Sequence, residues 1–457
     1  MADIKIDNAT ILTLNPTRDI ILNGSILIEN NIIIGIGPRN DLLQETADKV
    51  INANGKLAVP GFFNNHIHIS YAHAVRGIFP DGLSFSKYLN QVFQLQSEMS
   101  AEEEYYTSLL GIIDMIKNGT TSFFEPGSVK HIPSLIKAIE KSGCRSIIGT
   151  SVVDTDNPIN LPVLNTDEAL SLMERTLSQY HNSISGRVRV WIMPYSINYS
   201  SKDLLIGSKL LSQTYNTGIS LHSSQNEEQS RITEKKTGKS PVEYLQDLNL
   251  LGNDLLLSHM VSVSDVELDL LSSTNTNVVH LPSAALKMAS GVTQIGKFPE
   301  MVDKKICLCL GTDAANNSNH MDILRSANIV ASIYKDTKQN SSIMSPETCL
   351  EMLTINGAKS LSMNKYLGSI EIGKKADIVL FDTLRPEWRS LFNPVNNLIY
   401  SADGRSISEV IIDGRIIIED GDFINIDELE LITKVQNIGE DLLSRSDIDP
   451  SFDWPLI

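Results

Sequence analysis

Cysteine is scarce in this chain of 457 residues. There are four cysteines, and no two of them form a Cys-x-x-Cys pair. Two of them, Cys307 and Cys309, lie in the apolar run KICLCLG, where buried and reduced thiols are expected. The sequence therefore predicts no disulfide framework, and its cysteine usage is typical of a cytoplasmic protein.

Long apolar runs and an excess of positive charge are also lacking. No apolar segment reaches the roughly 20 residues that a membrane-spanning helix needs. The start, MADIKIDNATILTL, has neither the basic region nor the unbroken apolar core of a signal peptide. Lys and Arg total 38 against 55 Asp and Glu, a formal net charge of −17. We therefore expect a cytoplasmic protein that binds neither nucleic acid nor a membrane surface.

The two ends of the chain share a β-rich texture. Short β-branched runs broken by Asn-Gly and Gly-Pro turns occupy residues 1–58, and similar runs such as GSIEIGKKADIVLFD return at 365–425. We expect these two segments to pair into one small β-sandwich domain. Residues 426–457 are predicted to form a C-terminal helical tail.

Residues 59–364 alternate short apolar strands with long helical patterns such as SAEEEYYTSLLGIIDMIKNG. Eight candidate strands can be counted: GFFNNHIHI, TTSFFEPG, CRSIIGTSV, VRVWIMPYS, GISLHSS, DLLLSHMV, TNVVHLP and ICLCLGTDAA. Eight strand–helix repeats predict an α/β fold, a (β/α)8 TIM barrel with its active site at the C-terminal strand ends. An open doubly wound sheet is the alternative. Polar, ligand-type residues end five of the eight strands, which favours a closed ring converging on one point.

Histidine gathers at those strand ends. The chain has nine histidines, and five of them and one aspartate end candidate strands: His66, His68, His222, His259, His280 and Asp313. A lone strand histidine is usually a hydrogen-bonded core residue, but that explanation does not account for five at converging ends. Three imidazoles and a carboxylate suit Zn²⁺ or, alternatively, Fe²⁺. The sequence therefore predicts a catalytic metal site.

Several of these segments resemble the amidohydrolase superfamily. The resemblance rests on VPGFFNNHIHIS, LLLSHMV, VVHLPSAALKMASG, LGTDAANNSNHMDIL and LGSIEIGKKADIVLFD, and it extends from about residue 5 to residue 425. It is closest to the chlorohydrolase/aminohydrolase group, which includes heterocycle deaminases and S-adenosylhomocysteine deaminase-like enzymes. The resemblance implies the same barrel and sandwich. It also implies a single metal ion, because VRVWIMPYSINYS lacks the strand-four lysine that bridges two metals in some members.

The resemblance further implies a role for each strand-end residue. His66, His68, His222 and Asp313 would be the metal ligands, and His259 would hydrogen-bond the metal-bound water. Metal-bound hydroxide would attack a ring carbon of a nitrogen heterocycle, with Asp313 and His259 accepting the proton. The implied activity is hydrolytic deamination, or displacement of an amine or halide, by a hydrolase of carbon–nitrogen bonds.

Other functions and properties stay open at this stage. The same hydroxide could open a ring, as in a cyclic amidohydrolase, and ammonia release would separate the two reactions. A non-enzymatic scaffold is disfavoured, because a scaffold has no need of four converging metal ligands. The expected partner is a small heterocyclic substrate, and the chain is expected to form a homodimer or a higher homo-oligomer.

The chain departs from the family pattern at the catalytic acid. The usual glutamate three residues after the strand-five histidine is Gln225 here, and an amide can orient a substrate but cannot shuttle a proton. A shifted register would place Ser224 at the ligand position and Glu227 at the acid position. Otherwise Glu227, Glu228 or Glu125 supplies the proton, or the substrate needs less acid assistance. We expect an altered substrate rather than an inactive enzyme.

Four further residues are candidate substrate contacts. Two of them follow strand one in YAHAVRG, one ends strand two and one ends strand seven: His73, Arg76, Glu125 and His280.

Overall fold

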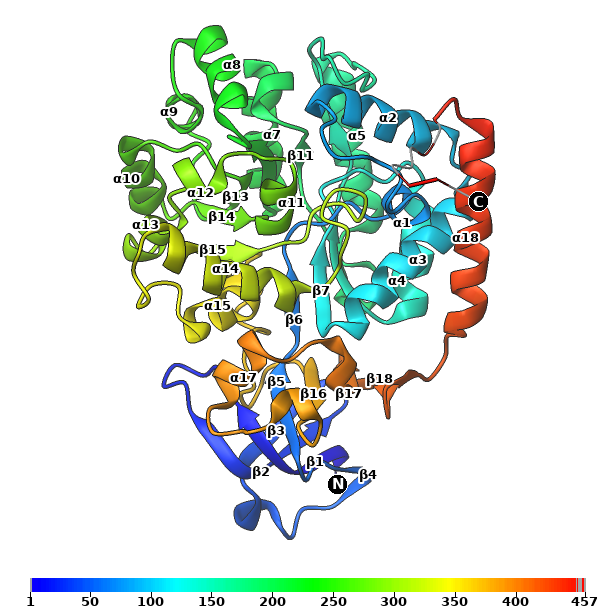
Figure 1. Ribbon diagram of the computed structural model, residues 1–457, viewed down its shortest axis with the longest axis vertical. Helices are drawn as coiled ribbons and strands as arrows, with labels where there is room; N and C mark the ends of the chain where they lie inside the picture. Colours follow the sequence, from blue (N-terminus) through cyan, green and yellow to red (C-terminus); the bar gives the residue numbers. More distant parts are fainter. Residues whose placement is uncertain (1, 449, 451–453, 456–457) are drawn as a thin grey trace.

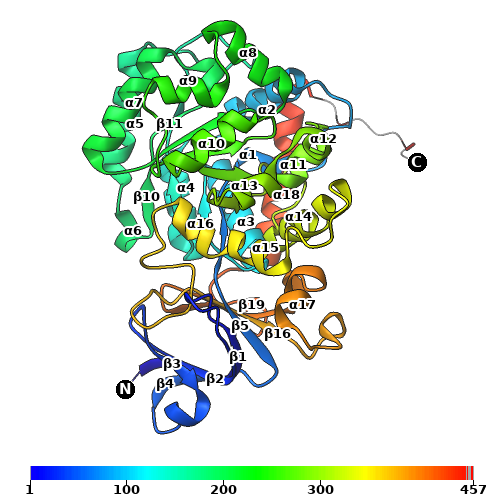
Figure 2. The same ribbon diagram turned by 90° about the vertical axis from the view of Figure 1, so that its left-hand side faces the viewer.

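The computed structural model describes residues 2–448, 450 and 454–455. Figure 1 shows a large α/β body, with strands inside and helices outside, above a smaller β-rich body. The view turned by 90° in Figure 2 shows the same two bodies along the long axis. The smaller body contains both the start of the chain, in blue, and segments from near its end, in orange.

Eight parallel strands form the centre of the larger body: β6 (Phe62–Asn64), β7 (Thr120–Phe124), β8 (Arg145–Ile148), β10 (Val188–Val190), β12 (Ile219–Ser223), β13 (Leu255–His259), β14 (Asn277–His280) and β15 (Leu308–Leu310). They pair in the orders β10-β8-β7-β6 and β12-β13-β14-β15. A parallel bridge between Ile192 and Ile219 joins the two groups on one side. On the other side, the Asn65 backbone N–H donates to the Leu310 carbonyl at 2.9 Å. The ring is closed, which confirms the predicted (β/α)8 barrel and excludes the open sheet.

Two short strands, β9 (Ser151–Val152) and β11 (Met193–Pro194), pair in parallel and extend strands three and four at their carboxyl ends. The helices of the larger body are α1 (Tyr71–Ala74), α2 (Phe85–Glu98), α3 (Ala101–Lys117), α4 (Ile132–Ser142), α5 (Thr166–Tyr180), α6 (Ser183–Gly186), α7 (Lys202–Tyr215), α8 (Glu227–Thr237), α9 (Pro241–Asp247), α10 (Asp265–Thr274), α11 (Pro282–Lys287), α12 (Val292–Ile295), α13 (Phe298–Asp303), α14 (Ile323–Thr337), α15 (Pro346–Leu353) and α16 (Ile355–Ser360). A capping box between Ser100 and Glu103 starts α3. Gly143, at φ 80°, ends α4 in the left-handed conformation that glycine adopts without strain.

The smaller body is built from both ends of the chain. Its strands are β1 (Ala2–Leu12), β2 (Ile20–Glu29), β3 (Ile32–Pro38), β4 (Ala47–Asn52), β5 (Lys56–Pro60), β16 (Ile378–Asp382), β17 (Ile407–Ile412), β18 (Arg415–Glu419) and β19 (Asp422–Phe423). β5 joins the two ends, because it pairs parallel to β1 and antiparallel to β16. Isoleucine and alanine side chains from these strands form a core separate from that of the barrel. The predicted composite sandwich is present, whereas the domain limits at 58, 364 and 425 stay a prediction.

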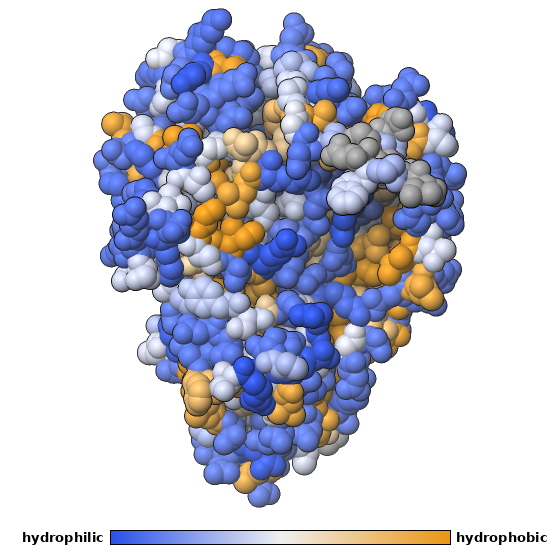
Figure 3. Space-filling view, viewed as in Figure 1, coloured by the Kyte–Doolittle hydropathy of each residue, from blue (hydrophilic) through white to orange (hydrophobic). Residues whose placement is uncertain are grey.

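Two more α-helices follow the barrel, and the described chain also has four short 3-10 helices: η1 (Arg39–Leu42), η2 (Ile197–Tyr199), η3 (Pro386–Trp388) and η4 (Gly404–Ser406). α17 (Pro394–Tyr400) packs on α14 and α15, and α18 (Glu428–Arg445), red in Figure 1, runs along α3 on the outside of the barrel. Residues 449, 451–453 and 456–457 of the predicted tail lie outside the described residues. Figure 3 shows a mostly hydrophilic face, with apolar residues gathered beside α3 and α18. Within the described part of the chain, no helix is long and apolar enough to cross a membrane.

Candidate metal centre and active site

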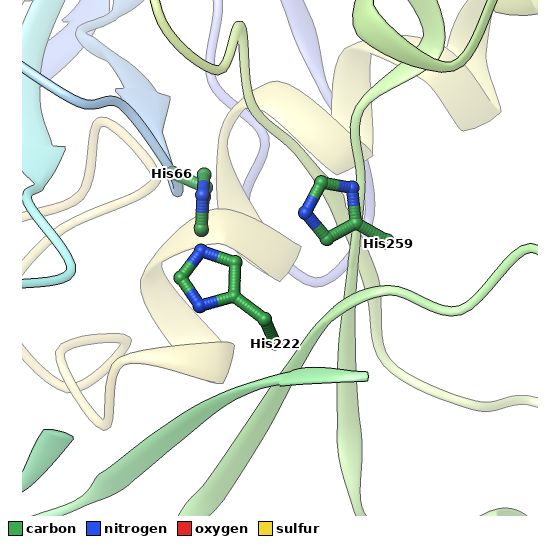
Figure 4. A group of neighbouring side chains, drawn as sticks. All are labelled: His66, His222 and His259. Carbon is green, nitrogen blue, oxygen red and sulfur yellow. The ribbon is translucent and has the colours of Figure 1, made fainter. Parts of the chain in front are cut away.

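Four imidazoles and one carboxylate converge at the carboxyl ends of the barrel strands. His66 and His68 follow β6, His222 lies in β12, His259 ends β13, and Asp313 follows β15. Figure 4 shows the rings of His66, His222 and His259 facing one small space. His66, His259 and Asp313 are buried, while His68 and His222 are partly exposed. Parallel strands of a closed ring bring these residues together from positions up to 247 apart in the chain.

The distances between these side chains fit one metal ion. His68 Nε2 lies 3.2 Å from His66 Nε2 and 3.4 Å from His222 Nε2. Two nitrogens bound to one tetrahedral zinc ion are separated by about 3.3–3.4 Å. Asp313 Oδ1 lies 3.7 Å from His68 Nε2. Two trios, His66–His68–Asp313 and His66–His222–His259, each keep their ligand atoms within 4.8 Å of one another. The donor set therefore suits a single divalent ion such as zinc.

The imidazoles are in the state that metal binding requires. Burial lowers the pKa of all four rings below the usual value, and lowers the pKa of His222 to about 4. His222 Nδ1 donates to the Tyr195 carbonyl at 2.6 Å, so the lone pair of its Nε2 faces the cluster. His66 Nδ1 lies 2.9 Å from Ser258 Oγ. Neutral rings held by such partners are typical metal ligands.

Asp313 is held in place by its own loop. Its Oδ1 accepts a hydrogen bond from the Ala314 backbone N–H at 2.7 Å, and its Oδ2 accepts one from Asn317 Nδ2 at 3.1 Å. Burial raises the pKa of Asp313 to about 6, although these two hydrogen bonds oppose the shift. Asp313 and His259 have φ values of 62° and 77°, a strained region for residues with a side chain and one common at functional sites. Asp313 can thus both approach a cation and accept a proton near neutral pH.

A cavity of about 270 Å³ opens onto the cluster. Five aromatic residues contribute to its wall: Tyr71, Phe85, Tyr88, Phe93 and Tyr195. Asp313 is the only carboxylate among the described lining residues, and Lys130 is the only Lys or Arg among them. The Lys130 ammonium donates to the Ser97 carbonyl at 2.7 Å and to the Met99 carbonyl at 3.3 Å, at the end of α2. The cavity is therefore largely apolar, and the ammonium of Lys130, the one cation of its described lining, is hydrogen-bonded to backbone carbonyls rather than to a carboxylate.

Gln225 lies in the wall of this cavity. Glu227 and Glu228, the alternative acids, are exposed in the first turn of α8, where Glu227 pairs with Arg231 at 2.9 Å. The side chain that reaches the cluster is that of His222, whereas Ser224 Oγ lies 3.2 Å from Ser223 Oγ. The ungapped register stays a prediction; under it an amide, not a carboxylate, occupies the acid position, and this amide lies in the cavity wall.

Two predicted substrate contacts, His73 and Arg76, are not among the described residues that line the cavity. His73, in α1, is buried, and its ring lies against Gly111 of α3, where even an added Cβ would come within 2.6 Å of it. The Arg76 guanidinium instead pairs with Asp114 of α3 at 2.6 Å. These two side chains face α3, because the chain turns away from the strand end after Ser70.

Glu125 and His280 are also missing from the described lining residues. The Glu125 carboxylate accepts hydrogen bonds from the Gly127 backbone N–H at 2.8 Å and from the Ser128 backbone N–H at 2.9 Å. His280 is buried, and its Nε2 lies 2.9 Å from the Tyr334 hydroxyl of α14. Neither side chain belongs to the described cavity wall, and the direct substrate contact expected for Glu125 and His280 stays a prediction.

Helix α2 supplies cavity residues that the sequence analysis missed. They lie at spacings of three, four, eight and eleven from the first: Phe85, Tyr88, Leu89, Phe93 and Gln96. These spacings place them on one side of a helix. The apolar repeat in FSKYLNQVFQLQSE, with Ser84 as an N-cap, is the signal that identifies this helix.

Comparison with known proteins gives consistent matches along the chain. A model described as "Amidohydrolase family" matches residues 57–417. A 5'-deoxyadenosine deaminase from Methanobrevibacter smithii is 32% identical over 440 residues, which cover 95% of this chain and 97% of that protein. A 5-methylthioadenosine/S-adenosylhomocysteine deaminase from Thermoanaerobacter pseudethanolicus is 30% identical over 444 residues, covering 97% of this chain and all of that protein (100%).

Two solved structures share the fold. The crystal structure of an adenosine deaminase from Xanthomonas campestris with bound zinc superimposes with a TM-score of 0.90 at 21% identity, covering 97% of this chain and 99% of that one. Atrazine chlorohydrolase from Arthrobacter aurescens, complexed with zinc, gives a TM-score of 0.88 at 20% identity, covering 95% and 100%. At these identities, the likeness establishes a common fold.

Proposed function

The chain belongs to the amidohydrolase family, and we propose that it is a zinc-dependent deaminase of a small, neutral nitrogen heterocycle. It is a hydrolase of carbon–nitrogen bonds, as the sequence resemblance implied. One observation supports the proposal above all: the His/Asp cluster meets an aromatic cavity in which Asp313 is the only carboxylate among the described lining residues. Such a cavity accepts a flat ring and turns one of its carbons toward the cluster.

The residues of the cluster divide the chemistry between them. His66, His68, His222 and Asp313 would hold the divalent ion, which supplies Lewis-acid activation of a water molecule. Asp313 would accept the proton of that water, because it is the only carboxylate among the described residues of the cavity wall and its Oδ1 lies 3.7 Å from His68 Nε2. His259, buried beside His66 and His222, is placed to hydrogen-bond the same water.

The amide of Gln225 changes how the leaving group is protonated. Gln225 can donate one hydrogen bond to the substrate and accept another, but it cannot give up a proton. The proton for the departing amine must therefore come from Asp313, after Asp313 has taken it from water. This arrangement favours rings whose leaving group departs with little protonation, or rings with a group that an amide can hold on both sides.

The charged residues of the cavity wall restrict which substituents the substrate's ring can carry. Lys130, the only lysine among the described lining residues, donates two of its three ammonium N–H bonds to backbone carbonyls. With one donor left, a carboxylate or phosphate on the substrate would be only partly compensated for the water that it loses. A substrate ammonium would meet the same penalty away from Asp313. Among the substrates in the relatives' names, 5'-deoxyadenosine and 5-methylthioadenosine are neutral, whereas S-adenosylhomocysteine carries an amino acid group. We therefore propose neutral compounds with apolar substituents as the preferred substrates.

Ammonia release from a panel of aminated heterocycles tests this function. We expect purified, zinc-loaded protein to release ammonia, and kcat/KM to be at least tenfold higher for 5-methylthioadenosine than for S-adenosylhomocysteine. His222→Ala serves as the inactive control. Ring opening without ammonia would instead favour a cyclic amidohydrolase, and a preference for the amino acid-bearing compound would contradict the proposed neutral substrate.

Two expectations about the whole protein stay predictions within this proposal. One is a homodimer or higher homo-oligomer, which light scattering of the purified protein measures. The other is a cytoplasmic location, which fractionation of cells that produce the protein measures.

A further inference from the structure

Glu104, in the first turn of α3, is a buried carboxylate that the chemistry above does not use. Its Oε1 accepts hydrogen bonds from Ser70 Oγ at 2.8 Å and from the Lys130 backbone N–H at 3.0 Å, and its Oε2 accepts one from the His131 backbone N–H. Within the described residues, it forms no ion pair with Lys, Arg or His. Since burying an unpaired carboxylate is costly, these three donors explain why it is tolerated.

The first segment that Glu104 holds leads into the cavity. Ser70 follows His68 by two residues and directly precedes Tyr71, which lines the cavity. Ser70 has φ 80° and ψ −120°, a backbone conformation that only glycine adopts readily. A strained turn of this kind persists when its surroundings hold it. The hydrogen bond from the Ser70 hydroxyl to Glu104 is one such restraint.

The second segment that Glu104 holds forms another part of the cavity wall. Residues 126–130 follow β7, and all five of them line the cavity. Glu104 binds the amides of Lys130 and His131 at the far end of this loop. Glu125 binds the amides of Gly127 and Ser128 at its near end. Two buried carboxylates thus hold the loop by its backbone amides at both ends.

We propose that Glu104 is a positioning residue that fixes the Ser70 turn and the 126–130 loop relative to each other. It touches neither the cavity nor the metal cluster, so it acts through the two segments. The substrate contacts made by Tyr71 and by the loop depend on it, whereas metal binding does not. The inference about substrate rests on the proposed function; the inference about the loop does not.

Three variants test this role, with zinc content, hydrogen exchange and steady-state kinetics as readouts. Glu104→Ala removes all three acceptor contacts. Glu104→Gln keeps the shape of the side chain and can still accept the hydrogen bond from the Ser70 hydroxyl. Its single carbonyl oxygen, however, cannot accept hydrogen bonds from both backbone amides equally well. Glu102→Gln is the matched control, because Glu102 lies on the same helix with a 70% exposed side chain that only approaches Lys434, at 3.4 Å.

We expect the Lys130 and His131 amides to exchange at least tenfold faster in Glu104→Ala, and at least one of them to do so in Glu104→Gln. Zinc content should match that of the wild type. KM should rise at least tenfold in Glu104→Ala with kcat changed less than threefold, and Glu104→Gln should restore part of the loss. Glu102→Gln should behave as the wild type does in every readout.

Unchanged exchange at both amides in folded Glu104→Gln would overturn the proposal, as would loss of zinc or a fall in kcat with KM unchanged. If Glu104→Ala does not fold, the isosteric Glu104→Gln provides the test. Exchange is measured without substrate, so a wild-type protein that releases no ammonia would count against the proposed function and leave the test of Glu104 intact.

Discussion

His222 and His259 lie at the carboxyl ends of the neighbouring strands β12 and β13, yet their side chains are held differently. His222 Nε2 lies 3.4 Å from His68 Nε2, and its other nitrogen is fixed on the Tyr195 carbonyl. His259 belongs to the trio of His66 and His222, and it has a φ of 77°, a conformation uncommon for residues with a side chain. At the residue scale, the fixed Nδ1 of His222 supports our proposal that His222 is a metal ligand, whereas His259 is proposed to hydrogen-bond the reacting water.

The two histidines should therefore respond differently to replacement by alanine. We expect His222→Ala to lose both zinc and activity, because a ligand of the ion is removed. His259→Ala should keep most of its zinc while kcat falls about 100-fold, the scale of a lost acid–base group. Elemental analysis of both purified variants and of the wild type measures their zinc content. Equal loss of zinc from the two variants would refute the assigned roles.

Gln225 permits a prediction about the unusual acid position. Gln225→Glu removes the amide's donor and leaves its substrate partner unpaired, a penalty of roughly 1–3 kcal/mol. We expect kcat/KM on the preferred substrate to fall, and side activity on ordinary aminated rings such as adenine to rise, since a carboxylate can pass a proton. Steady-state kinetics on both substrates measures the change. An improved native reaction would show that the proton is handled elsewhere.

At the element scale, the number of barrel strands was predictable from the sequence, but their lengths were not. GFFNNHIHI was predicted as one strand, yet β6 covers only Phe62–Asn64. The backbone beyond it bonds alternately to both neighbours, with Asn65 donating to Leu310 of β15 and Ile67 donating to Phe124 of β7. Such alternation depends on strands far away in the sequence, which a local pattern does not contain.

The same limit explains which site residues were predictable. The metal-type residues were found because their chemistry is rare at strand ends. Burial behind the wall was not predictable for His280, since its hydrogen-bond partner Tyr334 is 54 residues away. Helix α2, by contrast, was readable from its apolar repeat and was overlooked.

The loop after β7 should give stability a pH dependence through Glu125. Burial raises the pKa of Glu125 from 4.5 to about 7, against the hydrogen bonds from Ser128 and Gly127. Between these values the unfolded chain loses the proton while the folded protein keeps it, so stability falls as pH rises. The full effect is about 3 kcal/mol. Unfolding curves at pH 5 and pH 8 should show the wild type losing stability relative to Glu125→Gln, which lacks this titration. If the unfolding free energies of the two proteins changed by the same amount between pH 5 and pH 8, the raised pKa of Glu125 would be contradicted.

At the scale of the whole molecule, a buried ion network joins the barrel to the sandwich. Arg145 of β8 donates to both oxygens of Asp377, at 2.7 and 3.0 Å, and to Asp413 at 2.6 Å. Asp377 precedes β16 and Asp413 follows β17, so one guanidinium holds two segments of the sandwich. The Arg145 side chain is only 5% exposed. The two bodies are thus joined opposite the catalytic end of the barrel.

Removing this guanidinium should destabilise the protein strongly. Arg145→Ala leaves the buried Asp377 and the partly buried Asp413 without their guanidinium partner, for which we expect a loss of about 3–5 kcal/mol. Arg175→Ala, on the exposed side of α5, is the control and should change stability by less than about 0.5 kcal/mol. Denaturant unfolding measures both variants. A loss from Arg145→Ala no larger than that of the control would show that the network does not hold the two bodies together.

The most direct test of the central claim is ammonia release measured while zinc is removed and restored. The account predicts that the wild type binds close to one zinc ion per chain and deaminates a neutral heterocycle. Chelation should abolish ammonia release, and added zinc should restore it in proportion to occupancy. Full activity in metal-free protein, or no ammonia from any aminated ring at full zinc occupancy, would contradict the account.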